Sequence, residues 1–417
     1  MKHFITGFPP IGTLTEETKD LCYDEYREAN CHIHTPYSFS AFKGMDEIFR
    51  MAVRENITVL GINDFYVTDG YDAFHKGCVE NGIFPLFNIE FIGLLKDEQK
   101  RGIRINDPNN PGRIYFCGKG LDYPFHTDFF SGMRLKNVIR ENQNQIRAMI
   151  AKINSLIFKQ GLDMKLSYEA IKKEYAEGLV MERHIVKAVR LLIEKYFTVK
   201  EEQINFIEKL WGEKKSEFAS GLPADFENEI RSKLLKNGRP AFIEENEKSF
   251  LKLEKIINII VRAGGIPCYP VLLDDYHGKY TEFESEPVKL LKSLQKLNIG
   301  CIELIPGRND LSILKNFVEF FHANGFIIIL GTEHNTPEMA PLSISAKGKT
   351  PLDGTLKKIA WEGACVIAAH QYLRINGMQG CATHNSRIIA KQRQELARLG
   401  QRVIEYFINA NKRQNET

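Results

Sequence analysis

The amino-acid sequence predicts an α/β fold in which seven strands alternate with helices and close into a barrel. Three observations indicate this fold. Hydrophobic residues make up 43% and charged residues 26% of the 417 residues, which is typical of a globular protein. Seven short apolar runs are bounded by turn residues. Segments with helical periodicity separate most of these runs, and this alternation predicts an α/β architecture.

The predicted strands are hydrophobic along almost their whole length, a pattern typical of parallel strands that are buried on both faces. They span residues 29–34, 57–62, 83–91, 113–118, 265–270, 300–305 and 326–331. The helices predicted between them span residues 45–56, 71–81, 251–263, 287–297 and 311–324. Seven strands with outer helices fit a closed, distorted TIM-like (β/α)7 barrel better than an open sheet.

Two helical segments fall outside this alternation. Between the fourth and fifth strands, residues 131–247 contain charged amphipathic helices and no convincing strand. The helices expected there span 133–159, 182–196 and 224–236. We therefore predict a helical insertion domain at 131–247 that packs over one rim of a barrel formed by residues 21–130 and 248–350. Residues 351–417 are predicted to form a C-terminal helical extension.

The composition argues against several classes of protein. The 56 Lys and Arg against 53 Asp and Glu give a net charge of +3, which does not indicate nucleic-acid binding. The strongest apolar run, at 326–330, has the length of a strand and not the ~18–20 residues of a membrane span. The N-terminal segment MKHFITGFPPIG lacks the apolar core of a signal peptide, and the eight cysteines are scattered without a C-x-x-C pair. We therefore expect a cytoplasmic protein without membrane association.

Side chains that commonly bind metals follow several of the predicted strands. His32 and His34 are two residues apart in the first strand, so they point to the same face, about 6–7 Å apart at Cα. Glu90, Glu303 and Glu333 end the third, sixth and seventh strands. Imidazoles and carboxylates gathered at one barrel mouth destabilise each other unless a cation joins them. The strand ends therefore predict a metal site.

Each of these signals also has a purely structural interpretation. His32 and His34 could be two ordinary hydrogen-bonded histidines, and Asp64, after the second strand, could be only a helix N-cap. Glu333 and His334 precede Asn335-Thr336-Pro337 and could belong to a turn. The metal interpretation is favoured because such side chains stand at the ends of four separate strands.

The same segments resemble the PHP (polymerase and histidinol phosphatase) superfamily of metal-dependent phosphoesterases. His32-Ile33-His34-Thr35 matches the His-x-His-Thr motif of that family, and Glu90 matches its third motif. Three further motifs are matched in part, by residues 62–65, 264–270 and 331–335. Two segments within 131–247 resemble the nucleotide and oligonucleotide phosphoesterase branch, which carries a helical insertion. These segments are 182–185 and 238–242.

The resemblance implies a metal centre from which several ligands are missing. The residues that match the ligands of the first metal are His32, His34, Glu90 and Glu333. Positions that would bind a second and a third metal hold Phe39-Ser40, Phe65, Asn335, Tyr115 and Tyr269. Because Phe and neutral Tyr are poor metal ligands, one divalent transition metal is expected. His and carboxylate ligands together suit Zn, Mn or Fe better than Ca or Mg.

Further residues are predicted to contact the substrate at this mouth. Asp64 is expected to act as the general acid or base, with His334 as the second choice. Tyr115 and Tyr269 are either oxyanion donors or ordinary barrel-lining residues. The side chains predicted to bind an anionic small molecule are Arg308, Lys119 and Arg183. Each of these three could instead be a solvated surface charge.

The resemblance implies a metal-dependent hydrolase, namely a phosphoesterase acting on a small phosphorylated or nucleotide-like substrate. The alternative is a PHP scaffold that has lost phosphoesterase activity and acts as a ligand-binding protein. A related alternative is a one-metal lyase or isomerase acting on a sugar or sugar acid. The motif order favours the hydrolase, whereas the missing ligands favour the alternatives.

Overall fold

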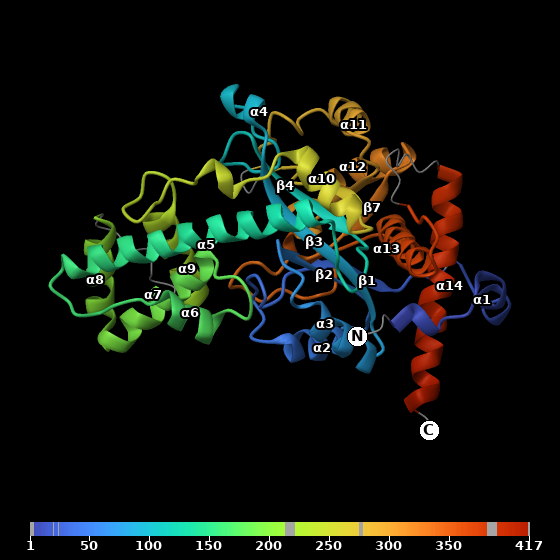
Figure 1. Cartoon of the computed structure of the whole chain (residues 1–417), viewed down its shortest axis with the longest axis horizontal. Helices are drawn as coiled ribbons and strands as arrows, with labels where there is room; N and C mark the ends of the chain where they lie inside the picture. The colour runs from blue at the N-terminus through green and yellow to red at the C-terminus, as the bar shows by residue number, and fades with distance from the viewer. Residues whose placement is uncertain are drawn as a thin grey trace.

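The computed structural model of the chain contains a seven-stranded sheet that curls into a nearly closed barrel (Figure 1). It describes residues 4–415 apart from 20, 24, 213–221, 275–277 and 382–389. The strands lie side by side in chain order, and each overlaps a strand predicted from the sequence. They are β1 (Glu28–Ile33), β2 (Ile57–Phe65), β3 (Phe84–Leu94), β4 (Arg113–Lys119), β5 (Ile266–Val271), β6 (Cys301–Leu304) and β7 (Ile327–Leu330).

The prediction that all strands run parallel is wrong for β4, which is antiparallel to both β3 and β5. The connection 95–112 contains only one short helix, α4 (Lys96–Lys100), so it turns back as a hairpin instead of crossing over the sheet. As a result β3 continues past Glu90 to Leu94 and pairs there with β4. Lys119, at the end of β4, pairs with Ile266 at the beginning of β5. The end of β4 therefore lies at the opposite end of the barrel from the predicted mouth.

The barrel closes between its first and last strands. Ile33 forms a parallel bridge with Glu333, just beyond the end of β7. On the other side of β1, the register places Phe65 of β2 opposite Glu90 of β3. The ends of β1 and β2 and the middle of β3 are therefore at one level, which is where the side chains of the candidate site lie.

Helices cover the outside of the barrel between successive strands (Figure 1). They are α2 (Met45–Arg54), α3 (Tyr71–Glu80), α10 (Leu253–Arg262), α11 (Pro287–Lys296) and α12 (Leu311–Ala323). Each overlaps a helix predicted from the apolar periodicity of the sequence. Shorter elements are α1 (Ile11–Glu17), the two-stranded sheet of β8 (Ser345–Ala346) and β9 (Thr350–Pro351), and single turns at Phe4–Gly7, Glu247–Ser249, Pro306–Arg308 and Lys347–Lys349.

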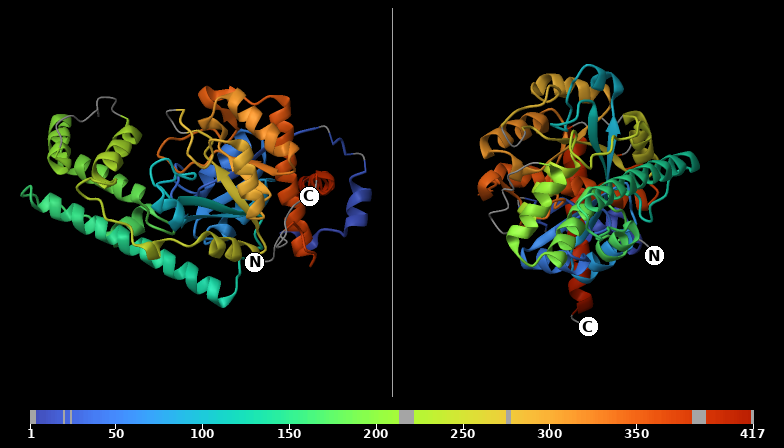
Figure 2. Two further views of the ribbon diagram at one scale, coloured as in Figure 1. Left: turned by 90° about the horizontal axis from the view of Figure 1, so that it is seen from above. Right: turned by 90° about the vertical axis from the view of Figure 1, so that its left-hand side faces the viewer.

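A group of helices between β4 and β5 lies to one side of the barrel (Figures 1 and 2). They are α5 (Phe129–Phe158), α6 (Tyr168–Tyr175), α7 (Glu182–Tyr196), α8 (Lys200–Trp211) and α9 (Pro223–Ile230), with a π-helical turn at Arg231–Leu235. These helices share a hydrophobic cluster of their own, which includes Ile153, Ile185 and Phe226. The predicted boundaries of an insertion domain, which would include the undescribed residues 213–221, stay predictions.

Two long helices lie on the other side of the barrel, α13 (Gly354–Ile375) and α14 (Ala390–Asn415) (Figures 1 and 2). The middle of α13 is buried almost all round, between β7 and α14. Gly363 makes the close approach possible, because a Cβ at that position would lie 1.9 Å from the carbonyl oxygen of Ile328. Part of the predicted extension, 382–389, lies outside the described residues. Among the described helices, none is both long and apolar enough to cross a membrane.

Candidate metal centre

The candidate site lies where β1 ends and the barrel closes. The backbone N–H of His34 donates to the carbonyl of Glu333 at 2.7 Å, and the N–H of Glu333 donates to the carbonyl of His32 at 2.9 Å. Gly331 allows this approach, since a Cβ there would lie 2.3 Å from the Cβ of His32. These contacts fix the backbone of both histidines against the end of β7.

Three acceptor atoms meet inside the barrel at this level. His32 Nε2 lies 3.2 Å from His34 Nε2. Glu90 Oε2 lies 3.1 Å from His34 Nε2 and 3.6 Å from His32 Nε2. All three side chains are almost completely buried. Within the described part of the chain, Glu90 Oε2 has no hydrogen-bond partner.

The second nitrogen of each ring has its own partner, which assigns the tautomer. His32 Nδ1 lies 2.9 Å from a carboxylate oxygen of Glu303. His34 Nδ1 lies 3.2 Å from Ser38 Oγ, and the Ser38 hydroxyl donates to Asp64 at 2.6 Å. Glu303 can only accept, and Ser38 accepts once its hydrogen is given to Asp64, so we assign the proton of each neutral ring to Nδ1. Both Nε2 atoms then present lone pairs to each other.

Three lone pairs that face one another in a buried place are unfavourable unless a proton or a metal cation lies between them. A tetrahedral ion with bonds of about 2.0–2.1 Å separates neighbouring ligand atoms by about 3.3 Å. The spacings of 3.1, 3.2 and 3.6 Å match that geometry. Two imidazoles and one carboxylate are ligands that suit a divalent transition metal. His32, His34 and Glu90 therefore fit a metal ion, whereas its identity and the number of ions stay predictions.

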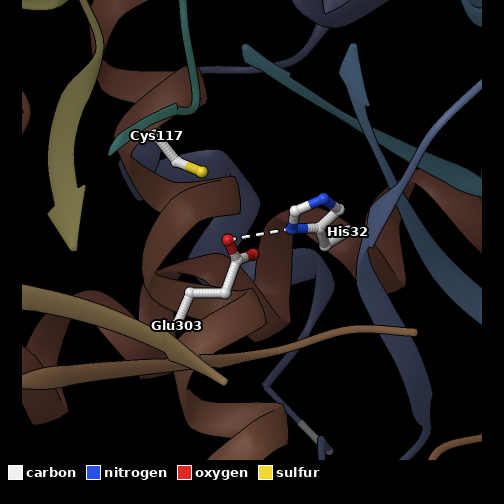
Figure 3. Close-up of side chains that lie close together, drawn as sticks. All are labelled: His32, Cys117 and Glu303. Carbon is white, nitrogen blue, oxygen red and sulfur yellow. Dashed lines mark ion pairs between the residues drawn. The ribbon is translucent and has the colours of Figure 1, made fainter. Parts of the chain in front are cut away.

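A second group of ligand-type atoms lies on the other side of the His32 ring (Figure 3). Cys117 and Glu303 both point toward His32 there, from β4 and β6. Lys119 Nζ lies 2.5 Å from Glu303 Oε1, and the Lys119 side chain is fully buried. Because the ammonium group already neutralises the Glu303 carboxylate, this second group does not require a metal.

The two buried carboxyl groups beside His32 consequently differ in acidity. Burial raises the pKa of Glu90 to about 8, because the pull of His32 offsets it only in part and Glu333 and Glu303 raise the pKa further. Burial also raises the pKa of Glu303, but His32 and Lys119 lower it more, to about 2. Glu90 is thus the carboxyl group of this pair that lacks a permanent cation.

Lys119 was predicted to bind substrate at the mouth, and its position does not fit that role. The antiparallel direction of β4 places its backbone at the far end of the barrel. From there the side chain reaches into the interior and donates to Asn63 Oδ1 at 3.0 Å as well as to Glu303. A fully buried ammonium group with two such partners is part of the barrel interior.

Glu333 was expected to be a fourth metal ligand. Its carboxylate is ion-paired with Arg308, and its role as a ligand stays a prediction. The exposed fraction of the side chain rises from 2% for His32 to 15% for Glu333 and 42% for Arg308, which marks the direction from the site to solvent. Burial raises the pKa of Glu333, but Arg308 and the two site histidines lower it more. Arg308 therefore lies on the exposed side of the site with Glu333 as its partner, and its role in binding the substrate stays a prediction.

Asp64 was predicted to be a general acid or base, and its carboxylate is engaged by the turn after β1. It accepts from the Thr35 backbone N–H at 2.8 Å, from Thr35 Oγ1 at 2.5 Å and from Ser38 Oγ at 2.6 Å. Burial raises the pKa of Asp64 more than His34 and these hydrogen bonds lower it. The contacts place Asp64 as a support of the segment that holds His34.

His334, the second choice for that role, has partners on both ring nitrogens. Nε2 lies 2.8 Å from the carbonyl of Ala340, and Nδ1 lies 2.9 Å from Thr332 Oγ1. Its ring stacks on Phe42 at 4.7 Å, and burial lowers its pKa. Glu333 and His334 both have positive φ, at 70° and 58°, a region that residues other than Gly seldom adopt.

The two tyrosines are placed differently from each other. Tyr269 is buried, and its hydroxyl donates to Glu284 at 2.9 Å, so it is already used inside the fold. Tyr115 lies on the hairpin beyond Glu90, with its ring 6.2 Å from that of Phe65. Because Phe65 in turn stacks on His34 at 4.7 Å, Tyr115 is near the site and its role as an oxyanion donor stays a prediction.

Arg183 lies at the start of α7, on the side of the helices between β4 and β5. Its guanidinium donates to Asn228 at 2.7 Å and lies 6.0 Å from the centre of the Phe39 ring. Phe39 belongs to the loop that follows His34. Burial and the nearby Arg231 lower the pKa of Arg183 to about 10. Its role in binding an anion stays a prediction.

Two contacts of the site were missed in the sequence. Ser38, four residues after His34, is the partner of that ring, and this spacing was the available signal. The Lys119–Glu303 pair gave no such signal, because it depends on the direction of β4 and joins residues far apart in the chain.

No protein-family model matches the chain, and no curated protein matches its sequence. Its fold resembles those of several solved structures, among them the following two. One is an amidohydrolase from Chromobacterium violaceum, with a TM-score of 0.51 and 14% identity. The other is described as a putative metal-dependent phosphoesterase from Bifidobacterium adolescentis, with a TM-score of 0.50 and 12% identity. Each match covers 80% of this chain and 96% of the other. The chain therefore shares the fold of these two proteins.

Proposed function

We propose that this protein is a metal-dependent hydrolase of the PHP type, a phosphoesterase of the nucleotide and oligonucleotide branch that uses one Zn, Mn or Fe ion. The observation that carries the proposal is the meeting of His32 Nε2, His34 Nε2 and Glu90 Oε2 without a donor between them. The order of the sequence motifs supports the PHP assignment. The descriptions of the two similar structures, a metal-dependent phosphoesterase and an amidohydrolase, support hydrolysis.

The chain contributes binding and orientation in this proposal. A metal ion at the three ligands would supply Lewis-acid chemistry, by polarising a substrate oxygen and making a water molecule more acidic. The Asp64–Ser38 pair holds the His34 ring, and the stacked Phe65 shields one of its faces from water. Arg308, exposed at the mouth, is the cation best placed to meet an anionic group of the substrate.

An anionic substrate is further supported by a cavity beside the mouth. The cavity, of about 230 Å³, lies between the loop that follows His34 and helices α6 and α7. Its lining includes three lysines, Lys43, Lys173 and Lys187, and two carboxylates, Glu174 and Glu177. Burial, together with Arg190 and Lys43 close by, lowers the pKa of Lys187, although Glu227 raises it. A bound phosphate or carboxylate would relieve this repulsion between cations.

A second candidate function is a one-metal lyase or isomerase, or a ligand-binding protein on the same scaffold. The pairing of Glu333 with Arg308 favours it, because it leaves the metal with three protein ligands. Phosphoryl transfer commonly uses two or three metals to balance the charge of the phosphate oxygens. The hydrogen bond from the Tyr269 hydroxyl to Glu284 also favours this second function, because it engages one of the two predicted oxyanion donors.

The experiment that separates these functions is a substrate panel with the metal-loaded protein. Phosphomonoesters, phosphodiesters, dinucleotides and amides would be assayed with Mn or Zn, beside the variants His34→Ala and Glu90→Ala. Phosphoester hydrolysis that both variants abolish is the expected result. If every phosphoester fails with every metal while one metal ion still binds, the second candidate function replaces the first.

A further inference from the structure

We propose that Glu303 and Lys119 are positioning residues for His32: together they fix its proton on Nδ1 and so present Nε2 to the metal. This inference rests on the proposed metal site, and it names two residues of the barrel interior that act through a ligand. Figure 3 shows Glu303 reaching the His32 ring from β6. Metal-binding histidines generally need such a partner, which orients the ring and selects the tautomer.

The geometry makes Glu303 an acceptor toward His32. Its Oε2 lies 2.9 Å from His32 Nδ1, and its Oε1 accepts from Lys119 at 2.5 Å. An ammonium group can only donate, so the carboxylate that faces it is held in the charged form that can only accept. The hydrogen between Glu303 and His32 therefore belongs to the imidazole nitrogen.

Asn63 also contacts the His32 ring, but it does not use the Nε2 lone pair that would bind the metal. Its Oδ1 accepts from Lys119 at 3.0 Å, which assigns Nδ2 as the atom that faces His32. Nδ2 lies 3.0 Å from Nε2 and 3.3 Å from Nδ1 of the ring. A donor in line with one ring nitrogen would be far from the other, so these nearly equal distances place the amide against the face of the ring. The Nε2 lone pair stays directed at His34 and Glu90.

Lys119 also explains why the ligand-type atoms beside it need no second ion. His32 Nδ1, Cys117 Sγ and a Glu303 oxygen all lie within 4.8 Å of one another. An ion there would compete with the Lys119 ammonium for the same carboxylate. A side chain of the protein thus supplies the cation on this side of His32, and the metal is needed only on the other.

The test reads the tautomer of His32 directly and the metal affinity separately. In metal-free protein labelled with ¹⁵N-histidine, long-range ¹H–¹⁵N correlation spectra should show His32 protonated at Nδ1. In Glu303→Gln the new amide can accept or donate, so both tautomers should appear, and Co²⁺ affinity should fall by about 10–100-fold with a shifted visible spectrum. In Glu303→Gln the Lys119 ammonium group is buried without its carboxylate partner. The double variant Lys119→Met/Glu303→Gln removes this charge, and its Co²⁺ affinity should stay as low as that of Glu303→Gln.

The matched control is Glu284→Gln. Glu284 is an equally buried carboxyl group that accepts from Tyr269 and from the backbone N–H groups of Leu272 and Leu273. This control should change Co²⁺ affinity by less than about threefold, well below the effect expected at Glu303. A wild-type His32 protonated at Nε2, or wild-type Co²⁺ affinity in the double variant, would overturn the positioning role. If no form binds metal but the tautomers behave as expected, the proposed function fails, and only the role of Glu303 and Lys119 in fixing the His32 proton on Nδ1 stands.

Discussion

The two sides of the His32 ring differ in how their charge is balanced. On the Nδ1 side, Lys119 holds the Glu303 carboxylate through Oε1, and Oε2 lies 2.9 Å from His32 Nδ1. On the Nε2 side, Glu90 lies beside His32 and His34, and among the described residues no Lys or Arg forms an ion pair with it. The side chains on both sides of the ring are equally buried, so burial alone does not explain the difference in charge balance. The difference teaches that the barrel has a built-in cation on one side and a place for an exchangeable cation on the other.

Removing the Lys119–Glu303 ion pair on the Nδ1 side should have the largest effect on stability. Lys119→Met leaves the Glu303 carboxylate buried without its partner, so the free energy of unfolding should fall by about 3–5 kcal/mol. Chemical denaturation of the metal-free protein measures this. Lys289→Met, which removes an exposed pair with Glu286, is the control and should cost less than about 1 kcal/mol. Equal losses in the two variants would mean that the interior pair does not stabilise the barrel.

Removing a metal ligand on the Nε2 side should abolish metal binding and leave the fold intact. His34→Ala removes one of three ligands, so metal affinity should fall by more than about 100-fold, beyond the usual effect of altering a residue that only supports a ligand. Equilibrium dialysis against Zn or Mn measures this. His126→Ala, at an exposed histidine, should bind metal like the wild type. Unchanged affinity in His34→Ala would refute the ligand set.

The comparison also predicts a pH dependence that belongs to Glu90. Its folded pKa, about 8, lies above its ordinary value, so the folded metal-free protein binds more protons than the unfolded chain between about pH 4.5 and 8. The Glu90 contribution to stability is therefore largest below about pH 4.5 and falls by up to about 1.4 kcal/mol per pH unit up to about pH 8. Denaturation across this range should show a shallower slope for Glu90→Gln. Burial also raises the pKa of Glu284 to about 8. Because Glu284 is present in both the wild type and Glu90→Gln, it does not contribute to the difference between their slopes.

The smallest expected effect is on the support of His34. Ser38→Ala removes the acceptor of the Nδ1 hydrogen of His34, so metal affinity should fall by about tenfold, the lower end for a residue that supports a ligand. Ser40→Ala is the matched control, because its hydroxyl accepts from the Phe42 backbone N–H and, within the described part of the chain, forms no hydrogen bond with the three proposed ligands. Competition with a chromogenic chelator measures both. Equal affinities in the two variants would show that the Ser38 contact does not orient His34.

The strands were predictable because each buried run is short and apolar. His32, His34 and Glu90 could be recognised because they stand at the ends of the predicted strands, although β3 itself continues past Glu90. The direction of β4 was not predictable from hydrophobicity, since a strand buried on both faces reads the same in either direction. The better signal was the connection 95–112, whose helix α4 spans only Lys96–Lys100 and is too short for a crossover.

The direction of β4 decides where the Lys119 side chain lies. With β4 parallel, Lys119 would end at the mouth beside Arg308, where a substrate anion was expected. With β4 antiparallel, the same residue enters the interior and meets Glu303 from a distant strand. The partner of Glu333 was equally hidden, because the turn that brings it to Arg308 has positive φ at two successive residues other than Gly.

The central claim is that one metal ion binds between His32, His34 and Glu90. Anomalous scattering from crystals of the Zn- or Mn-loaded protein, recorded at the absorption edge of that metal, tests it most directly. We predict a single peak bounded by His32 Nε2, His34 Nε2 and Glu90 Oε2. A peak beside Cys117 and Glu303, several peaks in the barrel, or none between the three ligands would contradict it.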